Sequence, residues 1–178
     1  MRIVVSGAGG FAGRALIRAL GDGHDIVALD SRLHGLPGIE GDLCDPVTLE
    51  RAFVAGCDAV VHLASVPGGA AERDPALAKR VNLDASMALI DAAAKAGRCP
   101  RFVFASSIAV FGDPLPAAVD DTTPLAPRLL YGAQKAMIEQ WIDTQTRRGE
   151  IAGLSLRLPG IVARPRAAGG MKSAFMSD

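Results

Sequence analysis

Short apolar runs alternate along the chain with segments in which apolar residues recur every three or four positions. The runs are rich in Val and Ile and predict strands, and the wider spacing predicts helices. Strands are expected over residues 3–5, 25–30, 39–43, 58–64, 101–106 and 151–158. Helices are expected over residues 11–20, 45–55, 75–96 and 131–148. Because strands separated by helices form right-handed crossovers, this order predicts a parallel sheet with helices on both faces.

Two aspartate-proline pairs mark expected helix starts. Asp45-Pro46 and Asp74-Pro75 each place a capping side chain directly before a proline at the first helical position. A proline-rich stretch over residues 112–127 is expected to be a loop. These local signals mark the boundaries of the expected elements. The sequence contains no internal repeat.

Two of the expected helices carry more apolar surface than a single contact with the sheet requires. In the helix over 75–96, one stripe comprises Leu77, Val81, Ala85 and Ala88, and a second comprises Leu83, Met87, Ile90 and Ala94. In the helix over 131–148, Ala133, Met137 and Trp141 recur beside Ile138 and Ile142. One stripe of each helix is expected to cover the sheet. The other stripe is buried either by a neighbouring element or by a second subunit, so a homodimer through these helices is one prediction.

Composition restricts the class of protein. The chain has 178 residues, of which 49% are apolar and 21% charged, enough for one well-packed domain. Lys plus Arg equals Asp plus Glu at 19 each, which argues against nucleic acid or an anionic membrane as the main partner. The three cysteines lack metal-type spacing, so we expect no metal site and a reducing, cytoplasmic location.

A glycine-rich turn lies between the first expected strand and the first expected helix. Glycines over residues 7–13 allow backbone N–H groups to approach a pyrophosphate at the helix N-terminus. Asp30 ends the second expected strand, where a carboxylate can bind an adenosine ribose and disfavours a 2′-phosphate. These features favour NAD over NADP, although Arg32 leaves NADP open. The alternative is a tight turn without a ligand.

Tyr131 and Lys135 form the candidate reactive pair. They lie four residues apart at the start of an expected helix, on one face, and Tyr131 is the sole tyrosine of the chain. Lowering a phenol pKa from about 10 to about 7 takes roughly 4 kcal/mol, which an ammonium and an oxidised nicotinamide can supply. Ser107 follows an expected strand and is a candidate partner for the substrate hydroxyl. A chance pairing is the alternative. His62, in an apolar strand, is interpreted as a packed histidine.

The ordered motifs resemble those of the extended short-chain dehydrogenase/reductase family, in its NAD-dependent epimerase/dehydratase branch. Gly7, Gly10 and Gly13 match its G-x-x-G-x-x-G turn, and residues 106–112 (SSIAVFG) resemble its S-S-x-x-V-Y-G signature. The resemblance implies a Rossmann-type fold, with Ser107, Tyr131 and Lys135 as catalytic residues. It implies that NAD binds at Gly7, Gly10, Phe11, Ala12, Gly13, Asp30, Ser31, Arg32, Asp42, Leu43, Leu63, Ala64, Ser65, Asn82, Ala105, Ser106, Tyr131, Lys135 and Pro159.

Departures from the family pattern refine the expected activity. Ile108 and Ala109 stand where sugar dehydratases of the family place an Asp-Glu pair, so a 4,6-dehydratase is not expected. Gly160 stands where asparagine is common, and the segment Arg157-Leu158-Pro159 resembles that of sugar-acid dehydrogenases. Family members continue into a substrate domain. We therefore expect a cofactor domain over 1–165 and the start of a truncated substrate region over 166–178.

The resemblance implies an NAD-dependent oxidoreductase that acts on a secondary hydroxyl of a sugar, nucleotide sugar or sugar acid. Within that class, both a nucleotide-sugar epimerase and a sugar-acid dehydrogenase stay open. A non-catalytic NAD-binding regulator or scaffold is the alternative from another class. The presence of Ser107, Tyr131 and Lys135 together argues against that alternative, because a regulator does not need all three.

Overall fold

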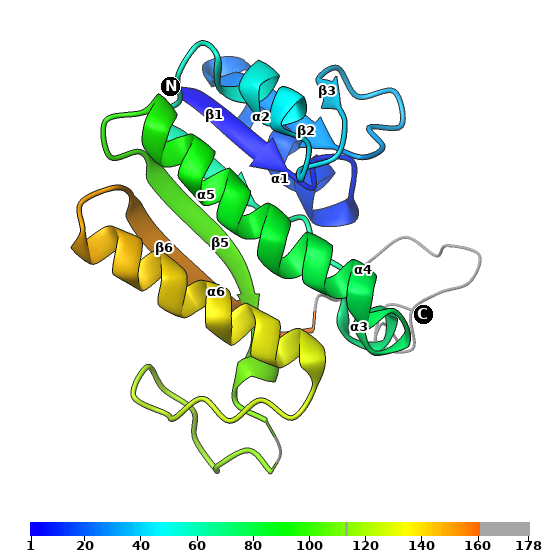
Figure 1. Cartoon of the computed structure of the whole chain (residues 1–178), viewed down its shortest axis with the longest axis vertical. Helices are drawn as coiled ribbons and strands as arrows, with labels where there is room; N and C mark the ends of the chain where they lie inside the picture. The colour runs from blue at the N-terminus through cyan, green and yellow to red at the C-terminus, as the bar shows by residue number, and fades with distance from the viewer. Residues whose placement is uncertain (113, 161–178) are drawn as a thin grey trace.

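The computed structural model describes residues 1–112 and 114–160, and strands and helices alternate along them (Figure 1). The strands are β1 (Arg2–Ser6), β2 (Asp25–Asp30), β3 (Ile39–Glu40), β4 (Ala59–His62), β5 (Arg101–Ser107) and β6 (Ala152–Leu158). The α-helices are α1 (Phe11–Leu20), α2 (Pro46–Phe53), α3 (Gly68–Arg73), α4 (Pro75–Lys79), α5 (Ala85–Ala96) and α6 (Leu130–Arg147). The turns η1 (Gly21–Gly23) and η3 (Ile108–Val110) are 3₁₀-helical, and η2 (Arg80–Asp84) is a π-helical segment. The expected substrate region over 166–178 lies outside the described residues.

All six strands form one parallel sheet in the order β3-β2-β1-β4-β5-β6. This order confirms the predicted Rossmann-type fold. The chain runs outward from β1 to β3 and then returns to β4 on the other side of β1. The strand order therefore reverses between β1 and β4, and in such sheets ligands bind in the crevice at the carboxyl ends of these strands.

Helices cover the two faces of the sheet unequally. In Figure 1, α5 and α6 lie side by side across the front of the sheet, and α1 lies behind it. The larger core cluster joins one face of the sheet to α2, α5 and α6, and the smaller cluster joins the other face to α1. On β6, Leu154 and Leu156 are 54% and 42% exposed. Among the described residues, no helix is long and apolar enough to cross a membrane.

Both predicted aspartate caps are present. The Asp45 carboxylate accepts a hydrogen bond from the N–H of Val47 at 3.1 Å, and the Asp74 carboxylate accepts one from the N–H of Leu77 at 3.0 Å. In each case proline occupies the start of the helix. An aspartate cap satisfies a backbone N–H that has no partner inside the helix, and its negative charge suits the helix N-terminus.

The backbone is helical over the whole of the expected range 75–96, with one π-helical segment inside it. This segment, η2, lies between α4 and α5 and adds a residue to one turn, which rotates the face that follows. As a result neither expected stripe matches the buried face of α5, which comprises Ala85, Ser86, Leu89, Ile90 and Ala93. Leu77 on α4 is 44% exposed. Helix α3 is an element that the sequence pattern does not predict, because its sequence GGAAER carries no apolar periodicity.

Helix α6 shows two apolar stripes, as predicted. Ile138 and Ile142 are buried against the sheet, whereas Met137 and Trp141 are 57% and 38% exposed. The exposed stripe provides a surface for a neighbouring element or a second copy. Self-association through this helix stays a prediction.

His62 is buried within the sheet, as predicted from its apolar strand. Its Nδ1 lies 2.5 Å from the Ser6 hydroxyl and its Nε2 lies 2.8 Å from the Ser86 hydroxyl. The ring stacks on Phe104 with centroids 5.6 Å apart. Burial, together with the charge of Lys135, lowers the pKa of His62 to about 3. The imidazole is therefore a neutral link between β1, β4 and α5.

This buried histidine should make the fold acid-sensitive. The unfolded chain takes up a proton at His62 below its ordinary pKa of 6.5, whereas the folded chain resists protonation down to about 3. Stability is therefore full above pH 6.5 and falls as the pH drops toward 3, by about 3 kcal/mol at pH 4. Urea denaturation across this range should show a flatter profile for His62→Gln. The exposed control His34→Asn should keep the wild-type slope, and equal slopes in all three proteins would disprove the assignment.

Candidate functional site

The glycine turn between β1 and α1 packs against the backbone that follows β4. Gly7 has a φ of +74°, and a Cβ placed there would lie 2.6 Å from the backbone nitrogen of Ala64. A Cβ on Gly9 would lie 1.9 Å from the carbonyl oxygen of Arg32, and one on Gly13 would lie 2.3 Å from that of Gly7. The turn therefore requires glycine at these positions. No side chain caps the N-terminus of α1, so its first turn presents backbone dipoles suited to an anion.

Asp30 is placed at the carboxyl end of β2 beside this turn. Its Oδ2 accepts a hydrogen bond from the N–H of Gly9 at 2.9 Å, and its Oδ1 accepts one from the N–H of Arg32 at 3.1 Å. The Ser31 hydroxyl donates to the same Oδ1 at 3.2 Å. Asp30 and the turn thus lie together, as the sequence predicts for a ribose-binding carboxylate next to a phosphate-binding loop.

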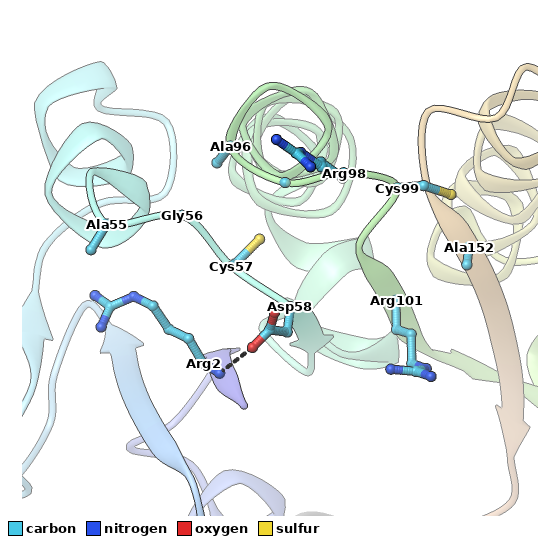
Figure 2. Close-up of a pocket in the computed structure, with 11 residues that line it drawn as sticks. Arg2, Ala55, Gly56, Cys57, Asp58, Ala96, Arg98, Cys99, Arg101 and Ala152 are labelled. Carbon is cyan, nitrogen blue, oxygen red and sulfur yellow. Dashed lines mark hydrogen bonds between the residues drawn. The ribbon is translucent and has the colours of Figure 1, made fainter.

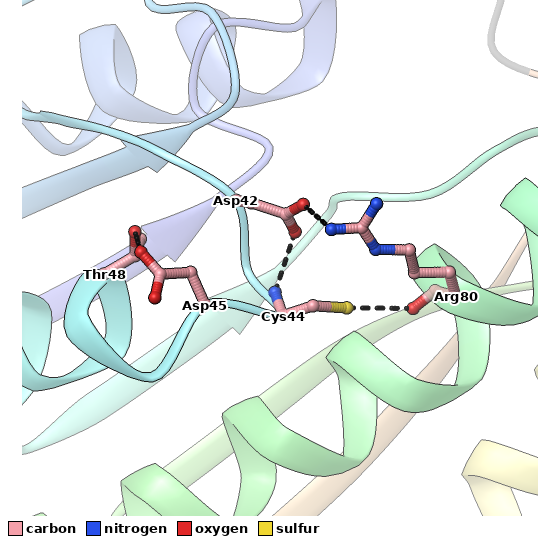
Figure 3. A network of polar contacts seen from close by, with 5 residues as sticks. All are labelled: Asp42, Cys44, Asp45, Thr48 and Arg80. Atoms are coloured by element: carbon pink, nitrogen blue, oxygen red, sulfur yellow. Dashed lines mark hydrogen bonds and ion pairs between the residues drawn. The ribbon is translucent and has the colours of Figure 1, made fainter.

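Two of the expected NAD-binding residues, Asp42 and Leu43, lie after β3, and the structure adds a partner to Asp42. Asp42 forms an ion pair with Arg80 of η2 and accepts a hydrogen bond from the N–H of Cys44 at 2.8 Å (Figure 3). The Sγ of Cys44 donates to the carbonyl oxygen of Arg80 at 3.3 Å. Leu43 is buried in the larger core cluster. These contacts tie the loop after β3 to the π segment, and no sequence signal pointed to Arg80.

Asn82 lies in the π segment and holds the chain that follows β4. Its Oδ1 accepts a hydrogen bond from the N–H of Val66 at 2.8 Å, and its Nδ2 donates to the carbonyl oxygen of Val66 at 3.0 Å. The same amide nitrogen donates to the side chain of Gln134 at 2.7 Å. The expected cofactor residues Leu63, Ala64 and Ser65 directly precede this anchor. In these contacts Asn82 positions protein groups, and its contact with NAD stays a prediction.

The three predicted catalytic residues meet where β5 ends and α6 begins. Lys135 is 2% exposed, and its Nζ donates to the carbonyl oxygen of Ala105 at 2.8 Å. The Nζ also lies 4.4 Å from the ring centroid of Phe104 and 5.6 Å from that of Tyr131. The Ser107 hydroxyl accepts a hydrogen bond from the N–H of Ala109 at 3.2 Å. The expected residue Pro159 follows β6, whose last residue pairs with Ser107 in the sheet register.

Burial shifts the two titratable members of this group. It lowers the pKa of Lys135 to about 7, against an opposing effect from Glu139. It raises the pKa of Tyr131, and the hydroxyls of Ser65 and Ser107 oppose that rise by hydrogen bonding. Desolvation thus favours the neutral form of both groups. An added positive charge next to Tyr131 would favour its phenolate.

A buried carboxylate lies beside the three predicted catalytic residues, and the sequence did not predict it. Glu139 is 6% exposed and pairs with Arg157 of β6, whose Nη2 donates to it at 2.9 Å. The Ser106 hydroxyl also donates to Glu139, so the Ser106 side chain is directed toward α6. The four-residue spacing from Lys135 to Glu139 is the sequence signal that could have placed this carboxylate on the same face of the helix as Lys135.

A cavity lies at the opposite edge of the sheet. Its volume is about 610 Å³, and it is lined at the amino ends of β1, β4 and β5 by Arg2, Asp58 and Arg101, with Arg98 from the turn after α5. In Figure 2 the three guanidinium groups point in different directions and do not converge on one point. Among the described residues, no cluster of His, Cys, Asp and Glu could hold a metal ion. The better candidate site is therefore the place where Ser107, Tyr131 and Lys135 meet.

Residues 3–177 match the NAD dependent epimerase/dehydratase family. The chain belongs to this family. It is 39% identical to a D-erythronate dehydrogenase from Cupriavidus necator, over 99% of this chain and 60% of that protein. It is similar in structure to a nucleoside-diphosphate-sugar epimerase from Agrobacterium tumefaciens (TM-score 0.84, 35% identity, 99% of this chain and 58% of that one). It is also similar to the UDP-glucose 4-epimerase of Thermus thermophilus in complex with NAD (TM-score 0.85, 28% identity, 97% of this chain and 59% of that one). The chain thus spans about 60% of the length of these relatives.

The glycine turn gives a direct test of the site's geometry. Gly7→Ala adds a Cβ that meets backbone at 2.6 Å and forces an alanine into a φ of +74°. We expect the free energy of unfolding to fall by on the order of 2 kcal/mol or more. Gly23→Ala is the matched control, since nothing lies within 4 Å of its Cβ. Similar losses for the two variants in chemical denaturation would contradict the close packing of the turn.

The buried lysine predicts a gain in stability when it is removed. The unfolded chain keeps the Lys135 proton up to a pKa of 10.5, whereas the folded chain releases it near 7. Wild-type stability therefore rises as the pH increases from 7 to 10.5. We expect Lys135→Met to raise the free energy of unfolding at pH 7 by on the order of 2 kcal/mol. The gain should shrink toward pH 10.5, and the exposed control Lys95→Met should show neither effect. A gain that grows with pH would count against a desolvated amine.

Proposed function

We propose that this chain catalyses NAD-dependent hydride transfer at a secondary hydroxyl of a sugar, nucleotide sugar or sugar acid. The observation that carries the proposal is the meeting of Ser107, Tyr131 and Lys135 at the same sheet edge as the glycine turn. Membership of the NAD dependent epimerase/dehydratase family supports it. So does the structural similarity to an epimerase in complex with NAD. The relatives have longer chains than this one, and the activity of the whole protein is part of this proposal.

The turn and Asp30 fit an adenine dinucleotide. The pyrophosphate would lie on the N-terminus of α1, where a Cβ at Gly9 or Gly13 would fill the space next to the backbone. The Asp30 carboxylate would accept hydrogen bonds from the adenosine ribose, and its charge would repel a 2′-phosphate. This arrangement favours NAD over NADP. The Asp42–Arg80 ion pair would set the position of the loop at the adenine end.

The chain's own groups divide the proton chemistry. The Tyr131 phenolate takes the proton of the substrate hydroxyl and becomes a phenol, and the Lys135 ammonium stabilises the phenolate before that step. The Ser107 hydroxyl, whose oxygen accepts from the N–H of Ala109, directs its hydrogen toward the substrate oxygen. The chemistry that NAD supplies when bound is acceptance of the hydride from the carbinol carbon. Ile108 and Ala109 carry no acid or base, so the proposal does not include elimination of water.

Two activities fit this machinery. In a dehydrogenase the ketone leaves, and in an epimerase it turns over and takes the hydride back. The identity to a D-erythronate dehydrogenase along 99% of the chain favours a sugar-acid dehydrogenase. Steady NADH accumulation with a sugar acid would support that choice, whereas isomerised product without net NADH would support an epimerase. NAD binding without turnover on any sugar or sugar acid would favour a regulatory role.

Replacing the phenol tests the mechanism. We expect Tyr131→Phe to lower kcat by about 10²–10⁴-fold, because the group that removes the proton is lost. Its affinity for NADH, measured by fluorescence titration, should stay close to that of the wild type. Trp141→Phe is the control, since it alters an exposed aromatic residue on the same helix and should keep full activity. Full turnover by Tyr131→Phe would remove the phenol from the mechanism.

A further inference from the structure

Glu139 is a buried carboxylate that the proposed reaction does not use directly. It is 6% exposed and has charged and polar donors on more than one side. Arg157 Nε donates to its Oε1 and Oε2 at 3.2 Å each, and Arg157 Nη2 donates to Oε2 at 2.9 Å. The Ser106 hydroxyl donates to Oε1. Both carboxylate oxygens are thus hydrogen-bonded to a guanidinium or a hydroxyl group.

Arg157 is itself fixed in place. It belongs to β6, which pairs with β5 so that Arg157 lies opposite Ser106 in the register. Its guanidinium carbon lies 5.0 Å from the ring centroid of Phe111, a cation–π contact at the end of the sheet. Pairing with Glu139 raises the pKa of Arg157, so the guanidinium stays charged. The carboxylate is thus held by a strand and not by a mobile surface side chain.

The spacing on α6 places this carboxylate on the face that carries the catalytic pair. Tyr131, Lys135 and Glu139 follow one another at intervals of four residues, which puts them on one side of the helix. The end of β5 faces them with consecutive residues: the Ala105 carbonyl accepts from Lys135, and the Ser106 hydroxyl donates to Glu139. The contact between α6 and β5 therefore holds the buried amine of Lys135 and the buried carboxylate of Glu139 about one helical turn apart.

We propose that Glu139, fixed by Arg157 and Ser106, is a positioning residue that keeps the Lys135 amine protonated beside Tyr131. This inference rests on the proposed function, because the ammonium matters through its effect on the Tyr131 phenolate. Glu139 acts on Lys135 by charge and touches neither substrate nor cofactor.

The other groups around Lys135 do not supply this effect. The Ala105 carbonyl and the Phe104 ring carry no net charge, and His62 is neutral because its pKa is about 3. Tyr131 carries no charge until it loses its proton. Burial lowers the pKa of Lys135 to about 7, and the negative charge of Glu139 is the effect that raises it. Without Glu139 the amine would release its proton at a lower pH still.

The test is an NMR titration of the Lys135 side chain, which needs neither NAD nor turnover. The chain has four lysines, so ¹³C-lysine labelling gives few signals, and Lys135→Arg identifies the signal that belongs to Lys135. In the wild type the Lys135 signal should titrate near pH 7. In Glu139→Gln, which keeps the shape of the side chain, the proton affinity of Lys135 should fall by about tenfold.

Matched variants separate charge from packing. Glu139→Asp keeps the negative charge, so the Lys135 signal of this variant should titrate close to that of the wild type. Asp143→Asn removes an exposed carboxylate one turn further along α6 and should leave Lys135 unchanged. The double variant Glu139→Gln/Arg157→Gln leaves no unpaired guanidinium, and it should also lower the proton affinity of Lys135. It serves as the second measurement where Glu139→Gln alone does not fold.

A wild-type Lys135 titration in Glu139→Gln or in the double variant would overturn the inference. If Asp143→Asn lowered the proton affinity of Lys135 as much as Glu139→Gln does, that result would overturn the inference as well. Failure of the proposed function would look different, because the chain would not turn over sugars with NAD while the titrations kept their predicted order. If the wild type turns over sugars with NAD but Glu139→Gln leaves the Lys135 titration unshifted, this inference alone is removed and the proposed function stands.

Discussion

The burial of one lysine amine is the constraint on which the site depends. Water is the best solvent for an ammonium, yet Lys135 is 2% exposed and lies against the ring of Phe104. The Ala105 carbonyl and the charge of Glu139 offset part of this cost. The cost that remains lowers the pKa of Lys135 to about 7. An amine with such a pKa responds strongly to a charge formed at its neighbour Tyr131.

The parallel sheet explains why the other parts of the site lie at the same place. Its strands all end at one edge, so the turn after β1, the carboxylate that ends β2 and the serine that ends β5 share that edge. The strand order reverses between β1 and β4, and in sheets of this kind ligands bind at the carboxyl ends of the strands at that point. Glycine allows the first turn to pack against the chain after β4, and Asn82 fixes that chain from the π segment. Stability and site geometry thus depend on the same contacts.

Local signals were predictable from the sequence, and contacts between distant elements were not. The caps at Asp45 and Asp74 follow from single dipeptides, and the parallel sheet follows from the alternation of strands and helices. The π segment over 80–84 breaks a helical period that the residue pattern continues, so periodicity alone predicts the wrong buried face for α5. Arg80 on Asp42 and Arg157 on Glu139 join residues that only the folded sheet brings together. The sequence therefore predicted Ser107, Tyr131 and Lys135, which the structure brings together, but not the charges that surround them.

The absorbance of Tyr131 gives the most direct test of the central claim, that Tyr131 acts as the base, with Lys135 and bound NAD⁺ favouring its phenolate. Tyr131 is the sole tyrosine, so the phenolate absorbance of the whole chain reports this one group. The account predicts that saturating NAD⁺ moves the phenolate titration to lower pH, and that NADH, whose ring is neutral, moves it less. A titration that saturating NAD⁺ leaves unchanged would contradict the account.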